Sequence, residues 1–385
     1  MTRRAAIVAA VQTKYAADRQ DVSYEELVWE VVEKVTQSVG LTWADRVQSG
    51  HAIQSIISCC EDYWDARTIA QFCIERELGA HSMPEVKVSA DGAQAVYLAV
   101  MQILSGTYDV VLVAGHRKES VSVRSIIENA GLDPVYMRPL GIDYRTGAAL
   151  QARRYMSAYG VTEEDCARVV VRNRRNGKGN PFALLQSDVT VDKVLRSPML
   201  ADPIKHLDAK PVCDGACALI VASEETARKL TDKPVAIKGV GNCYDLHYLG
   251  DRDLAECEAL ENAARRAYGM AGIKEPAKEI DIAEISGEYS YQELLWAEGL
   301  GLCGKGKGKE INSGKNKGMT IAINPSGGLF SGVPNGVAGM SRVAEAFLQL
   351  RNEAAGRQVD SARSALAHGV TGCCGQAHSV IILGN

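Results

Sequence analysis

Runs of apolar, β-branched residues alternate along the chain with longer stretches whose apolar positions recur every three or four residues. The run from Ala5 to Val11 predicts a first strand, and the stretch from Tyr24 to Val39 predicts the helix that follows it. Farther on, a predicted helix at Ala95 to Leu104 precedes a predicted strand at Val110 to Ala114. This alternation is typical of α/β proteins, in which helices cover both faces of the sheets.

Two parts of the chain show the same order of elements, which indicates a weak internal repeat. In the first part, Ser89-Ala-Asp-Gly92 leads into a helical pattern, and the strand Val110 to Val113 follows. In the second part, Ser331-Gly-Val-Pro334 precedes a helical pattern, and the chain ends on a strand from Ser379 to Leu383. We therefore expect two similar α/β halves packed back to back. The predicted division is a first half (residues 1–120), an insertion (121–235) and a second half (236–385).

The insertion is expected to be mostly helical. A long helical pattern runs around Ala148 to Tyr159, and a basic turn is predicted at Arg172 to Lys178. The basic cluster is either a solvated face or a site for the phosphates of a nucleotide, with Arg174 and Lys178 as the candidates.

Composition and charge exclude several classes of protein. A net charge of −4 and a pI near 6.0 give no basic field for nucleic acid. No apolar stretch approaches the ~20 residues of a membrane span, and the start of the chain lacks the cleavage site of a signal peptide, so the cytoplasm is the expected location. The glycine and lysine repeat from Gly304 to Glu310, with Ser313 to Lys317 after it, predicts a mobile surface loop.

The eleven cysteines are expected to be reduced thiols, since no secretory signal accompanies them. They show no Cys-x-x-Cys spacing, and an adjacent pair such as Cys59-Cys60 does not fit one tetrahedral metal, so no metal site is predicted. Most of the cysteines are expected to be small core residues.

Ordered blocks of sequence, spread along the whole chain, carry a family resemblance. They are Asp109 to Gly115, Thr162 to Asp165, Arg172 to Arg175 with Asn180-Pro181, Met199 to Asp202, Pro211 to Ala216, Asn324 to Gly328 and Leu366 to His368. These blocks resemble the sterol-carrier-type branch of the thiolase superfamily. The resemblance implies a five-layer αβαβα thiolase fold, with the insertion as a loop domain over coenzyme A and a homodimer formed through the core sheets. It also implies an acyl-coenzyme A as ligand, coenzyme A as substrate or product, no permanently bound cofactor, and a small partner subunit with a zinc ribbon and an OB-fold.

The same resemblance implies a cysteine nucleophile at the start of a buried helix in the first half, where the helix N-terminus stabilises a thiolate. Counting back from Asp109 places that position on Ser89, which is a poorer nucleophile unless a base activates it. The alternative is that Ser89 only caps the helix. Two histidines normally complete such a site, and Ser286 and Val333 occupy the matching positions. The usual two-step thiolysis is therefore not expected in its usual form.

Other side chains are candidates for the missing chemistry. Cys373 and Cys374 lie in a glycine-flanked loop that resembles the one carrying a catalytic cysteine in the degradative and biosynthetic relatives, although the pair is offset by a few residues from that position. The two cysteines are either reactive or simply packed there. Glu288 and Tyr289 lie on the segment that lost its histidine and can act as acid or base. Alternatively, Tyr289 and Tyr291 form one face of a strand.

Three residues are further candidates for the acyl-coenzyme A site. Asn324 and Gly328 bound a glycine-rich turn whose N–H groups either face a thioester oxygen or serve a conformational purpose. His116 follows a core strand and is either a site residue or a hydrogen-bonded structural one.

Two classes of function remain open. The leading hypothesis is an enzyme that makes or breaks a carbon–carbon bond beside a thioester, by thiolytic acyl transfer on a 3-oxoacyl-coenzyme A or by retro-aldol cleavage of a 3-hydroxyacyl-coenzyme A. Loss of the cysteine favours the second reaction, and the small residues Ser286 and Val333 leave room for a bulky acyl group. The alternative is a non-catalytic subunit that binds acyl-coenzyme A and supports an active partner.

Overall fold

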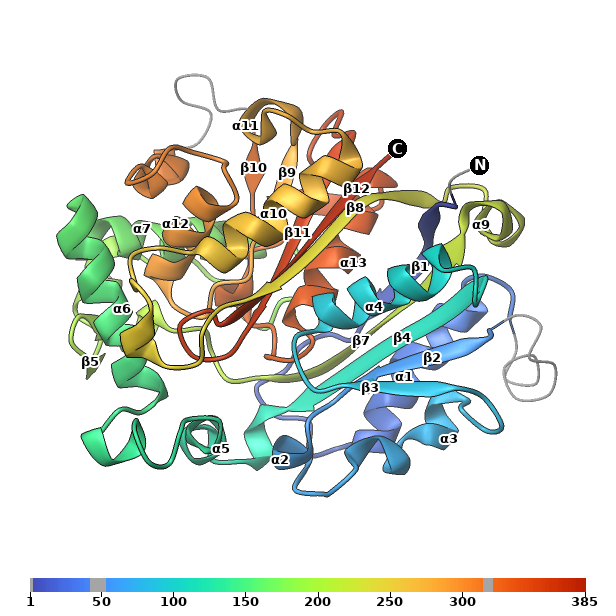
Figure 1. Cartoon of the computed structure of the whole chain (residues 1–385), viewed down its shortest axis with the longest axis horizontal. Coiled ribbons are helices and arrows are strands. Elements are labelled where there is room, and N and C mark those ends of the chain that lie inside the picture. The colour runs from blue at the N-terminus through green and yellow to red at the C-terminus, as the bar shows by residue number, and fades with distance from the viewer. Residues whose placement is uncertain (1–2, 42–52, 314–320) are drawn as a thin grey trace.

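The structure is a computed structural model that describes residues 3–41, 53–313 and 321–385 (Figure 1). Its main element is a ten-stranded sheet in the order β10-β9-β11-β12-β8-β1-β7-β4-β2-β3. A separate pair consists of β5 and β6. The strands are β1 (Ala5–Gln12), β2 (Ser55–Cys59), β3 (Glu85–Val88), β4 (Val110–Lys118), β5 (Met199–Ala201), β6 (Ile204–Lys205), β7 (Asp214–Ser223), β8 (Val235–Tyr244), β9 (Ile282–Glu284), β10 (Ala322–Ile323), β11 (Ser364–Thr371) and β12 (Ala377–Gly384).

The long sheet divides between β1 and β8 into two groups of five strands. From the outer edge to the middle, one group reads β3-β2-β4-β7-β1 and the other reads β10-β9-β11-β12-β8, so the two have the same connectivity. The expectation of two similar α/β halves is confirmed. The internal repeat predicted from the sequence had matched the strand Val110 to Val113 with Ser379 to Leu383, and this match is wrong. The counterpart of β4 is β11, whereas β12 corresponds to β7. Central strands are apolar throughout, so their pattern alone does not tell one from the next.

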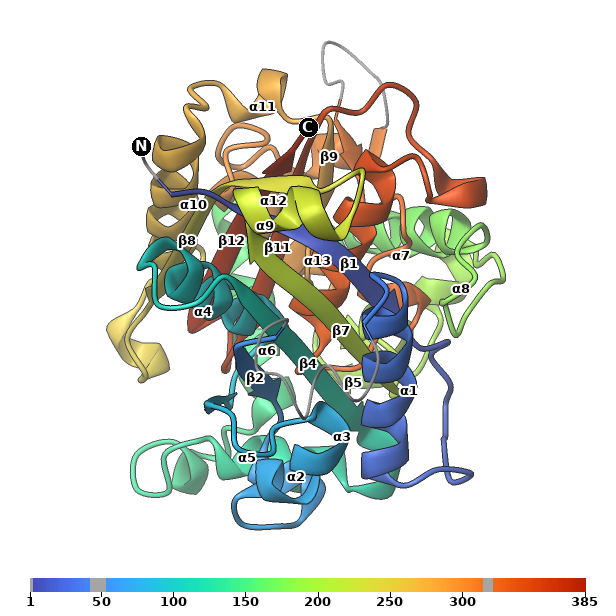
Figure 2. The same ribbon diagram turned by 90° about the vertical axis from the view of Figure 1, so that its right-hand side faces the viewer.

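Four long helices complete the layers. Helices α4 (Gly92–Leu104) and α13 (Ala338–Leu350) pack against each other between the two halves of the sheet, whereas α1 (Tyr24–Gln37) and α10 (Glu258–Ala271) cover the outer faces. Figure 2 shows α1 and α10 on opposite sides of the sheets. The layers are therefore helix, sheet, helix pair, sheet and helix, as the resemblance implied.

The local sequence explains where these helices begin and which of their faces are apolar. Ser23 caps α1 and exchanges hydrogen bonds with Glu26, and the apolar side chains of α1 recur on one face. Helix α4 is instead rich in alanine and valine on most sides, because it is buried between two sheets. Asp91 caps the N-terminus of α4, and its side chain accepts a hydrogen bond from the backbone N–H of Ala93.

The insertion contributes α5 (Arg124–Ala130), α6 (Tyr144–Tyr159), α7 (Glu163–Gly177) and α8 (Val191–Leu195). The predicted basic turn at Arg172 to Lys178 is instead the end of α7, because the capping box of Thr162 and Asp165 starts a helix that continues to Gly177. The insertion was expected to run to residue 235, but β7 pairs with both β1 and β4 and so lies in the sheet of the first half.

The glycine and lysine segment packs closely where a mobile loop was expected. The backbone N–H groups of Gly306 and Gly308 donate to the carboxylate of Glu298, at 2.9 and 2.8 Å, and the hydroxyl of Tyr155 also contacts that carboxylate. A buried acceptor therefore holds the segment against α12 (Ser290–Gly299). Its continuation, residues 314–317, lies outside the described residues.

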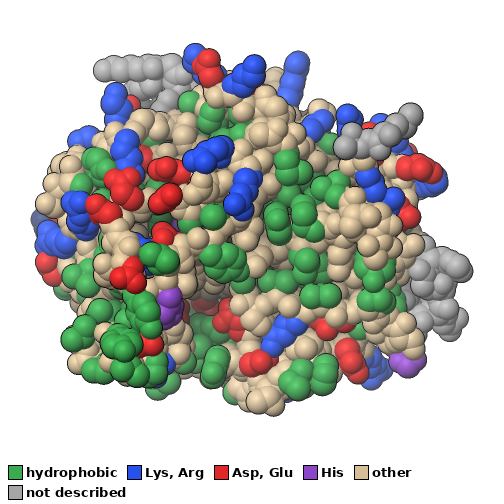
Figure 3. Space-filling view, in the orientation of Figure 1, with side chains coloured by type: hydrophobic (Ala, Val, Ile, Leu, Met, Phe, Trp, Pro, Cys, Tyr) green, Lys and Arg blue, Asp and Glu red, His purple; other side chains and the backbone are tan. Residues whose placement is uncertain are grey.

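The surface near α5 is unusually apolar. Figure 3 shows hydrophobic side chains gathered at the lower left, where Figure 1 draws α5 and the chain after it. The exposed apolar residues of this region are Val121, Val123, Ile126, Val135, Tyr136 and Leu140. Within the part of the chain that the structure describes, no helix is long and apolar enough to cross a membrane. The remaining short helices are α2 (Asp62–Asp65), α3 (Glu75–Leu78), α9 (Glu224–Leu230) and α11 (Pro276–Glu279).

Candidate functional site

Two neighbouring cavities lie between the insertion and the core, and Glu128 and Tyr144 line both of them. The outer cavity has a volume of about 380 Å³ and the inner cavity about 220 Å³. The polar and charged residues that distinguish the outer cavity include Arg124, Arg145, Arg174, His206 and Lys210. Those that distinguish the inner cavity include Asp91, Arg117, Ser286, Glu288, Asn335 and Cys373.

Asp91 lies at the N-terminus of α4, in the wall of the inner cavity. Its carboxylate accepts hydrogen bonds from the backbone N–H groups of Ala93 and Gly339, both at 2.8 Å. The carboxylate packs so tightly that a Cβ atom at Gly339 or Gly369 would come within 1.8 Å of it. Burial raises the pKa of Asp91 to about 7, although the hydrogen bonds from backbone N–H groups oppose the shift. Near neutral pH this carboxyl is therefore able both to accept and to release a proton.

Ser286 and Glu288 reach the inner cavity from the connection between β9 and α12. The hydroxyl of Ser286 is fully buried and has no hydrogen-bond partner among the described residues. Such an unpaired group is costly in an apolar interior, and it lines a cavity in which a ligand would satisfy it. Burial also raises the pKa of Glu288 to about 8, and the nearby Arg124 only partly offsets that rise. The backbone N–H of Lys210 donates to the Glu288 carbonyl at 2.8 Å and fixes this segment.

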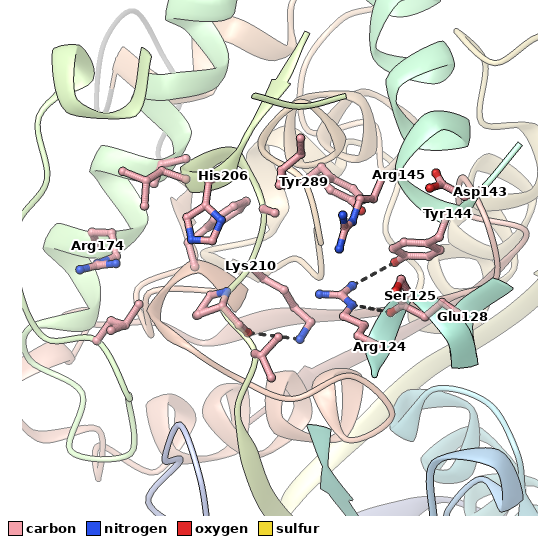
Figure 4. A pocket seen from close by; sticks show the side chains of 18 of the residues that line it. Arg124, Ser125, Glu128, Asp143, Tyr144, Arg145, Arg174, His206, Lys210 and Tyr289 are labelled. Atoms are coloured by element: carbon pink, nitrogen blue, oxygen red, sulfur yellow. Dashed lines mark hydrogen bonds and ion pairs between the residues drawn. The ribbon is translucent and has the colours of Figure 1, made fainter. Parts of the chain in front are cut away.

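Arg124 lies at the boundary of the two cavities. Its guanidinium contacts Glu128 at 2.5 Å and Glu288 at 3.4 Å, and it lies over the ring of Tyr144 with 5.3 Å to the centroid. Figure 4 shows the Arg124 contacts to Glu128 and to the Tyr144 hydroxyl. Tyr289 lies next to Tyr144, with 6.0 Å between ring centroids. One cation and two tyrosine rings therefore lie together beside the carboxyl groups of Glu128 and Glu288.

The outer cavity carries positive groups around its opening. Figure 4 shows Arg174 and His206 on one side and Arg145 on the other. Arg145 and His206 are exposed, whereas Arg174 is half-buried and donates to the carbonyl and hydroxyl of Ser187 at 3.1 and 2.9 Å. Burial lowers the pKa of Arg174 from its usual value, but a guanidinium keeps its charge near neutral pH. The arrangement suits an anionic, elongated ligand.

A fully buried ion pair beside the outer cavity holds the surrounding segments together. The ammonium of Lys210 lies 2.8 Å from both carboxylate oxygens of Glu119. The same carboxylate accepts from the backbone N–H groups of Cys213 and Asn335, at 3.0 and 2.9 Å. Asn335 lines the inner cavity, so Glu119 ties its wall to the segment that carries Glu288.

The sequence had predicted Ser89 at the position of the nucleophile. Ser89 is exposed, precedes the cap residue Asp91 by two positions, and is not among the residues that line either cavity. Of the two positions matched to histidines, Ser286 lines the inner cavity, whereas Val333 is buried in a small apolar cluster. Cys373 lines the same cavity as Ser286.

Cys374 is buried behind Cys373, and Tyr289 precedes α12 at its cap position. The alternative in which Tyr289 and Tyr291 form one face of a strand is wrong, because the segment starts a helix and the two rings are stacked with 6.4 Å between centroids. Tyr289 lines the outer cavity, and burial raises its pKa well above the usual value, so it carries a neutral phenol.

The turn from Asn324 to Gly328 is buried, and its N–H groups bond within the protein. The N–H of Ser326 donates to Glu284 at 3.0 Å, that of Gly327 donates to the Asn324 carbonyl at 2.9 Å, and that of Gly328 donates to the Ser326 hydroxyl at 3.3 Å. These three groups are therefore not available to a thioester oxygen in this arrangement. The φ angles of Asn324, 46°, and Gly328, 56°, favour the conformational reading of the turn.

His116 and Lys178 lie apart from the residues that line the two cavities. His116 is buried with its Nε2 atom 3.0 Å from an Asp65 carboxylate oxygen, which is the hydrogen-bonded structural arrangement. Lys178 is exposed and lies 2.7 Å from Asp188. Arg174 is thus the member of the predicted basic cluster that reaches the outer cavity.

Sequence reasoning missed several residues of the site. Asp91 had a usable signal, because an acidic residue directly before the first glycine of a helix is a typical cap. Arg124, Tyr144 and Arg145 had none, since they come from two separate helices of the insertion. Among the described residues no cluster of three histidine, cysteine or acidic side chains is arranged to hold a metal ion.

Comparisons with known proteins find thiolase-like sequence along most of the chain. The family model described as thiolase, N-terminal domain, matches residues 5–225, and the model described as thiolase C-terminal domain-like matches residues 242–385. An acetyl-CoA acetyltransferase of Methanothermobacter thermautotrophicus is 33% identical over 97% of this chain and 98% of its own. Sterol carrier protein 2 of Gallus gallus is 28% identical over 96% of this chain and 70% of its own.

A solved structure described as an Ltp2-ChsH2(DUF35) aldolase has a similar fold. Its TM-score is 0.82 over 99% of this chain and 97% of that one, at 24% identity. A likeness at this identity concerns the fold, which is the arrangement of layers and strands described above.

Proposed function

The chain belongs to the thiolase superfamily, in its sterol-carrier-type branch, and from this premise we propose that it cleaves or forms a carbon–carbon bond in a 3-hydroxyacyl-coenzyme A by acid–base chemistry of the retro-aldol type. The family to which it belongs comprises acyl-coenzyme A acyltransferases. The proposal concerns the reaction and the residues that carry it.

One observation carries the proposal: two carboxyl groups with raised pKa values, Asp91 at about 7 and Glu288 at about 8, line the same cavity. Groups that titrate near neutral pH suit proton transfer at both ends of a reaction. The unpaired hydroxyl of Ser286 lies in that cavity as well, whereas Ser89 does not line it.

In the proposed cleavage, ionised Asp91 removes the proton of the 3-hydroxyl group. The bond between C2 and C3 breaks, its electron pair passes to C2, and a carbonyl group forms at C3. Protonated Glu288 then delivers its proton to C2, and the products are an aldehyde or ketone and a shortened acyl-coenzyme A. The Ser286 hydroxyl donates to the thioester oxygen while negative charge collects there.

Coenzyme A would lie in the outer cavity with its thioester end toward Tyr144. Arg145 and Arg174 supply charge for the phosphates at the opening, and His206 offers a further hydrogen-bonding group there. The joined cavities also leave room for an acyl group larger than acetyl, and a bulky acyl group stays part of the proposal. No permanently bound cofactor is needed for this chemistry.

We propose further that the chain acts in an assembly. β3 lies at one end of the ten-stranded sheet, and an edge strand of this kind pairs readily with a second copy. The solved structure named above is described as an Ltp2-ChsH2(DUF35) aldolase, which supports a small partner subunit for this chain too.

The test incubates the purified chain with a 3-hydroxyacyl-coenzyme A, with and without free coenzyme A. A retro-aldol enzyme releases a shortened acyl-coenzyme A and a carbonyl product without free coenzyme A. Glu288→Gln and Asp91→Asn should each lower the rate by about 10²-fold or more, because each removes a proton-transfer group. Glu164→Gln, at an exposed carboxylate, is the matched control and should leave the rate unchanged. Full activity of both site variants would refute the proposal.

Thiolytic acyl transfer is the second candidate, because Cys373 lines the inner cavity. It would require free coenzyme A and a 3-oxoacyl substrate. Cys373→Ala would abolish thiolysis, whereas it would lower the rate of retro-aldol cleavage only slightly. Binding of acyl-coenzyme A without turnover of either substrate, even with the partner subunit present, would favour the non-catalytic subunit.

A further inference from the structure

The adjacent cysteines in the loop between β11 and β12 have their sulfur atoms 3.7 Å apart. The turn that brings them together uses the left-handed region of backbone space at Gly372, Cys374 and Gly375, with φ angles of 81°, 56° and 70°. Glycine adopts such angles readily, but cysteine does so at a cost. Cys374 therefore holds a strained backbone conformation directly beside a second cysteine.

The surroundings hold the backbone of the pair and bring both sulfurs against α6. Arg252 donates to the Cys373 carbonyl at 3.0 Å, and Gln151 donates to the Cys374 carbonyl at 3.2 Å. Gly147 of α6 faces the pair without a side chain, since a Cβ atom there would lie 2.9 Å from the Cys373 sulfur. The two thiols therefore pack directly against the backbone of α6, which only glycine at this position allows.

The two cysteines differ in access. Cys373 is half-buried and lines the inner cavity, so this residue borders space that a small solute can enter. Cys374 is only 5% exposed and lies behind it. An accessible thiol that reacts first, with a sheltered thiol beside it that resolves the product, is the arrangement of a reversible oxidation site.

We propose that Cys373 and Cys374 form a vicinal dithiol that hydroperoxides oxidise to a disulfide in the wall of the inner cavity. The Cys373 thiolate attacks an oxygen of hydrogen peroxide, the O–O bond breaks, and a sulfenic acid and water result. The Cys374 sulfur then attacks the sulfenic sulfur, the S–O bond breaks, and the hydroxyl group leaves with the Cys374 proton as a second water. In sum, two thiols and one peroxide become one disulfide and two waters. A thiol such as dithiothreitol reverses the step by exchange. The proposal is independent of the reaction proposed above.

The test treats the purified full-length chain with hydrogen peroxide, quenches it, alkylates the remaining thiols under denaturing conditions and maps peptides by mass spectrometry. After oxidation, the peptide that contains both cysteines should be lighter by two hydrogen atoms and should not be alkylated. After reduction with dithiothreitol, it should take up two alkyl groups. Exposed Cys73 is the internal control, because it lies on the surface away from the pair and should not join this disulfide.

A variant separates the role of Cys373, which reacts with the peroxide, from that of Cys374, which forms the disulfide. In Cys374→Ala, the sulfenic acid on Cys373 has no neighbouring thiol, so it should persist and react with dimedone, whereas wild type should show little dimedone adduct. The proposal is overturned if the wild-type peptide stays doubly alkylated at a peroxide dose that modifies Cys73. It is also overturned if Cys373 proceeds to sulfinic acid while Cys374 remains a free thiol. Because the wild-type map decides by itself, a variant that fails to fold does not leave the proposal untested.

Discussion

The guanidinium of Arg124 lies 3.4 Å from the carboxylate of Glu288, at the boundary between the two cavities. It also contacts Glu128, so one cation faces two carboxyl groups whose pKa values are both raised, chiefly by burial. Arg124 opposes that rise at each of them. The charge at this position therefore sets the pH range in which Glu288 releases its proton.

Arg124→Met should move the alkaline limb of the pH–rate profile to higher pH. With Arg124 present, Glu288 is protonated below about pH 8 and loses its function as an acid above it. Removal of the cation raises the pKa of Glu288 further, because desolvation and the carboxylates of Glu128 and Glu119 are then opposed only by the weaker hydrogen bond with Asn335. The measurement is kcat against pH, and Arg168→Met, at an exposed ion pair with Glu164, is the control. An unchanged alkaline limb would exclude Glu288 as the titrating group.

Asp91→Asn should flatten the dependence of stability on pH. Because the pKa of Asp91 is raised in the folded protein to about 7 from 3.8, its contribution is fully present below about pH 4 and is lost as the pH rises toward 7. The loss is at most about 4 kcal/mol for a shift of about 3 units. Asparagine also caps helices, so the variant should keep the cap and lose the titration. Urea unfolding at several pH values checks this, and equal slopes for both proteins would contradict it.

Glu119→Gln should destabilise the fold by about 3–5 kcal/mol, because it leaves the buried ammonium of Lys210 without its partner. Both side chains are fully buried, so water does not replace the lost interaction. The double variant Glu119→Gln with Lys210→Met removes both charges and should recover part of the loss. Chemical denaturation of the three variants measures the coupling. Strictly additive effects would show that the two residues do not interact.

Arg174→Ala and Arg145→Ala should each weaken coenzyme A binding by about tenfold or more, since a charge-assisted hydrogen bond contributes about 1.5–3 kcal/mol. Isothermal titration with coenzyme A gives the dissociation constants. Lys178→Ala is the informative comparison, because Lys178 is exposed and pairs with Asp188 outside the cavity. An equal loss in Lys178→Ala would support the sequence prediction for that residue and place the phosphates nearer the end of α7.

Val86→Asp should convert the expected homodimer into monomers. Val86 is 39% exposed on β3, the strand at one end of the sheet, and a buried aspartate in a paired edge would be left without a partner. Light scattering at micromolar concentration compares it with wild type and with Val123→Asp, which changes an equally apolar but separate surface residue. A monomeric wild type, or dimers in all three proteins, would count against pairing through β3.

The sequence by itself determined the class of fold and many of the elements. The apolar run at Ala5 to Val11 became β1, and the helical pattern after Tyr24 became α1, with ends within two residues of those expected. These elements are decided locally, because side-chain periodicity and the cap at Ser23 suffice to define them. The ordered blocks along the chain likewise sufficed for the family.

The tertiary structure decided which residues share a site. Asp91 and Glu288 are almost two hundred residues apart, and only the packing of the two halves puts them in one cavity. Their raised pKa values come from burial, which no local pattern encodes. The place of β7 between β1 and β4 had the same origin, since strand order depends on partners far away along the chain. Ser89, which local spacing had placed at the reactive centre, is exposed and does not line the cavity.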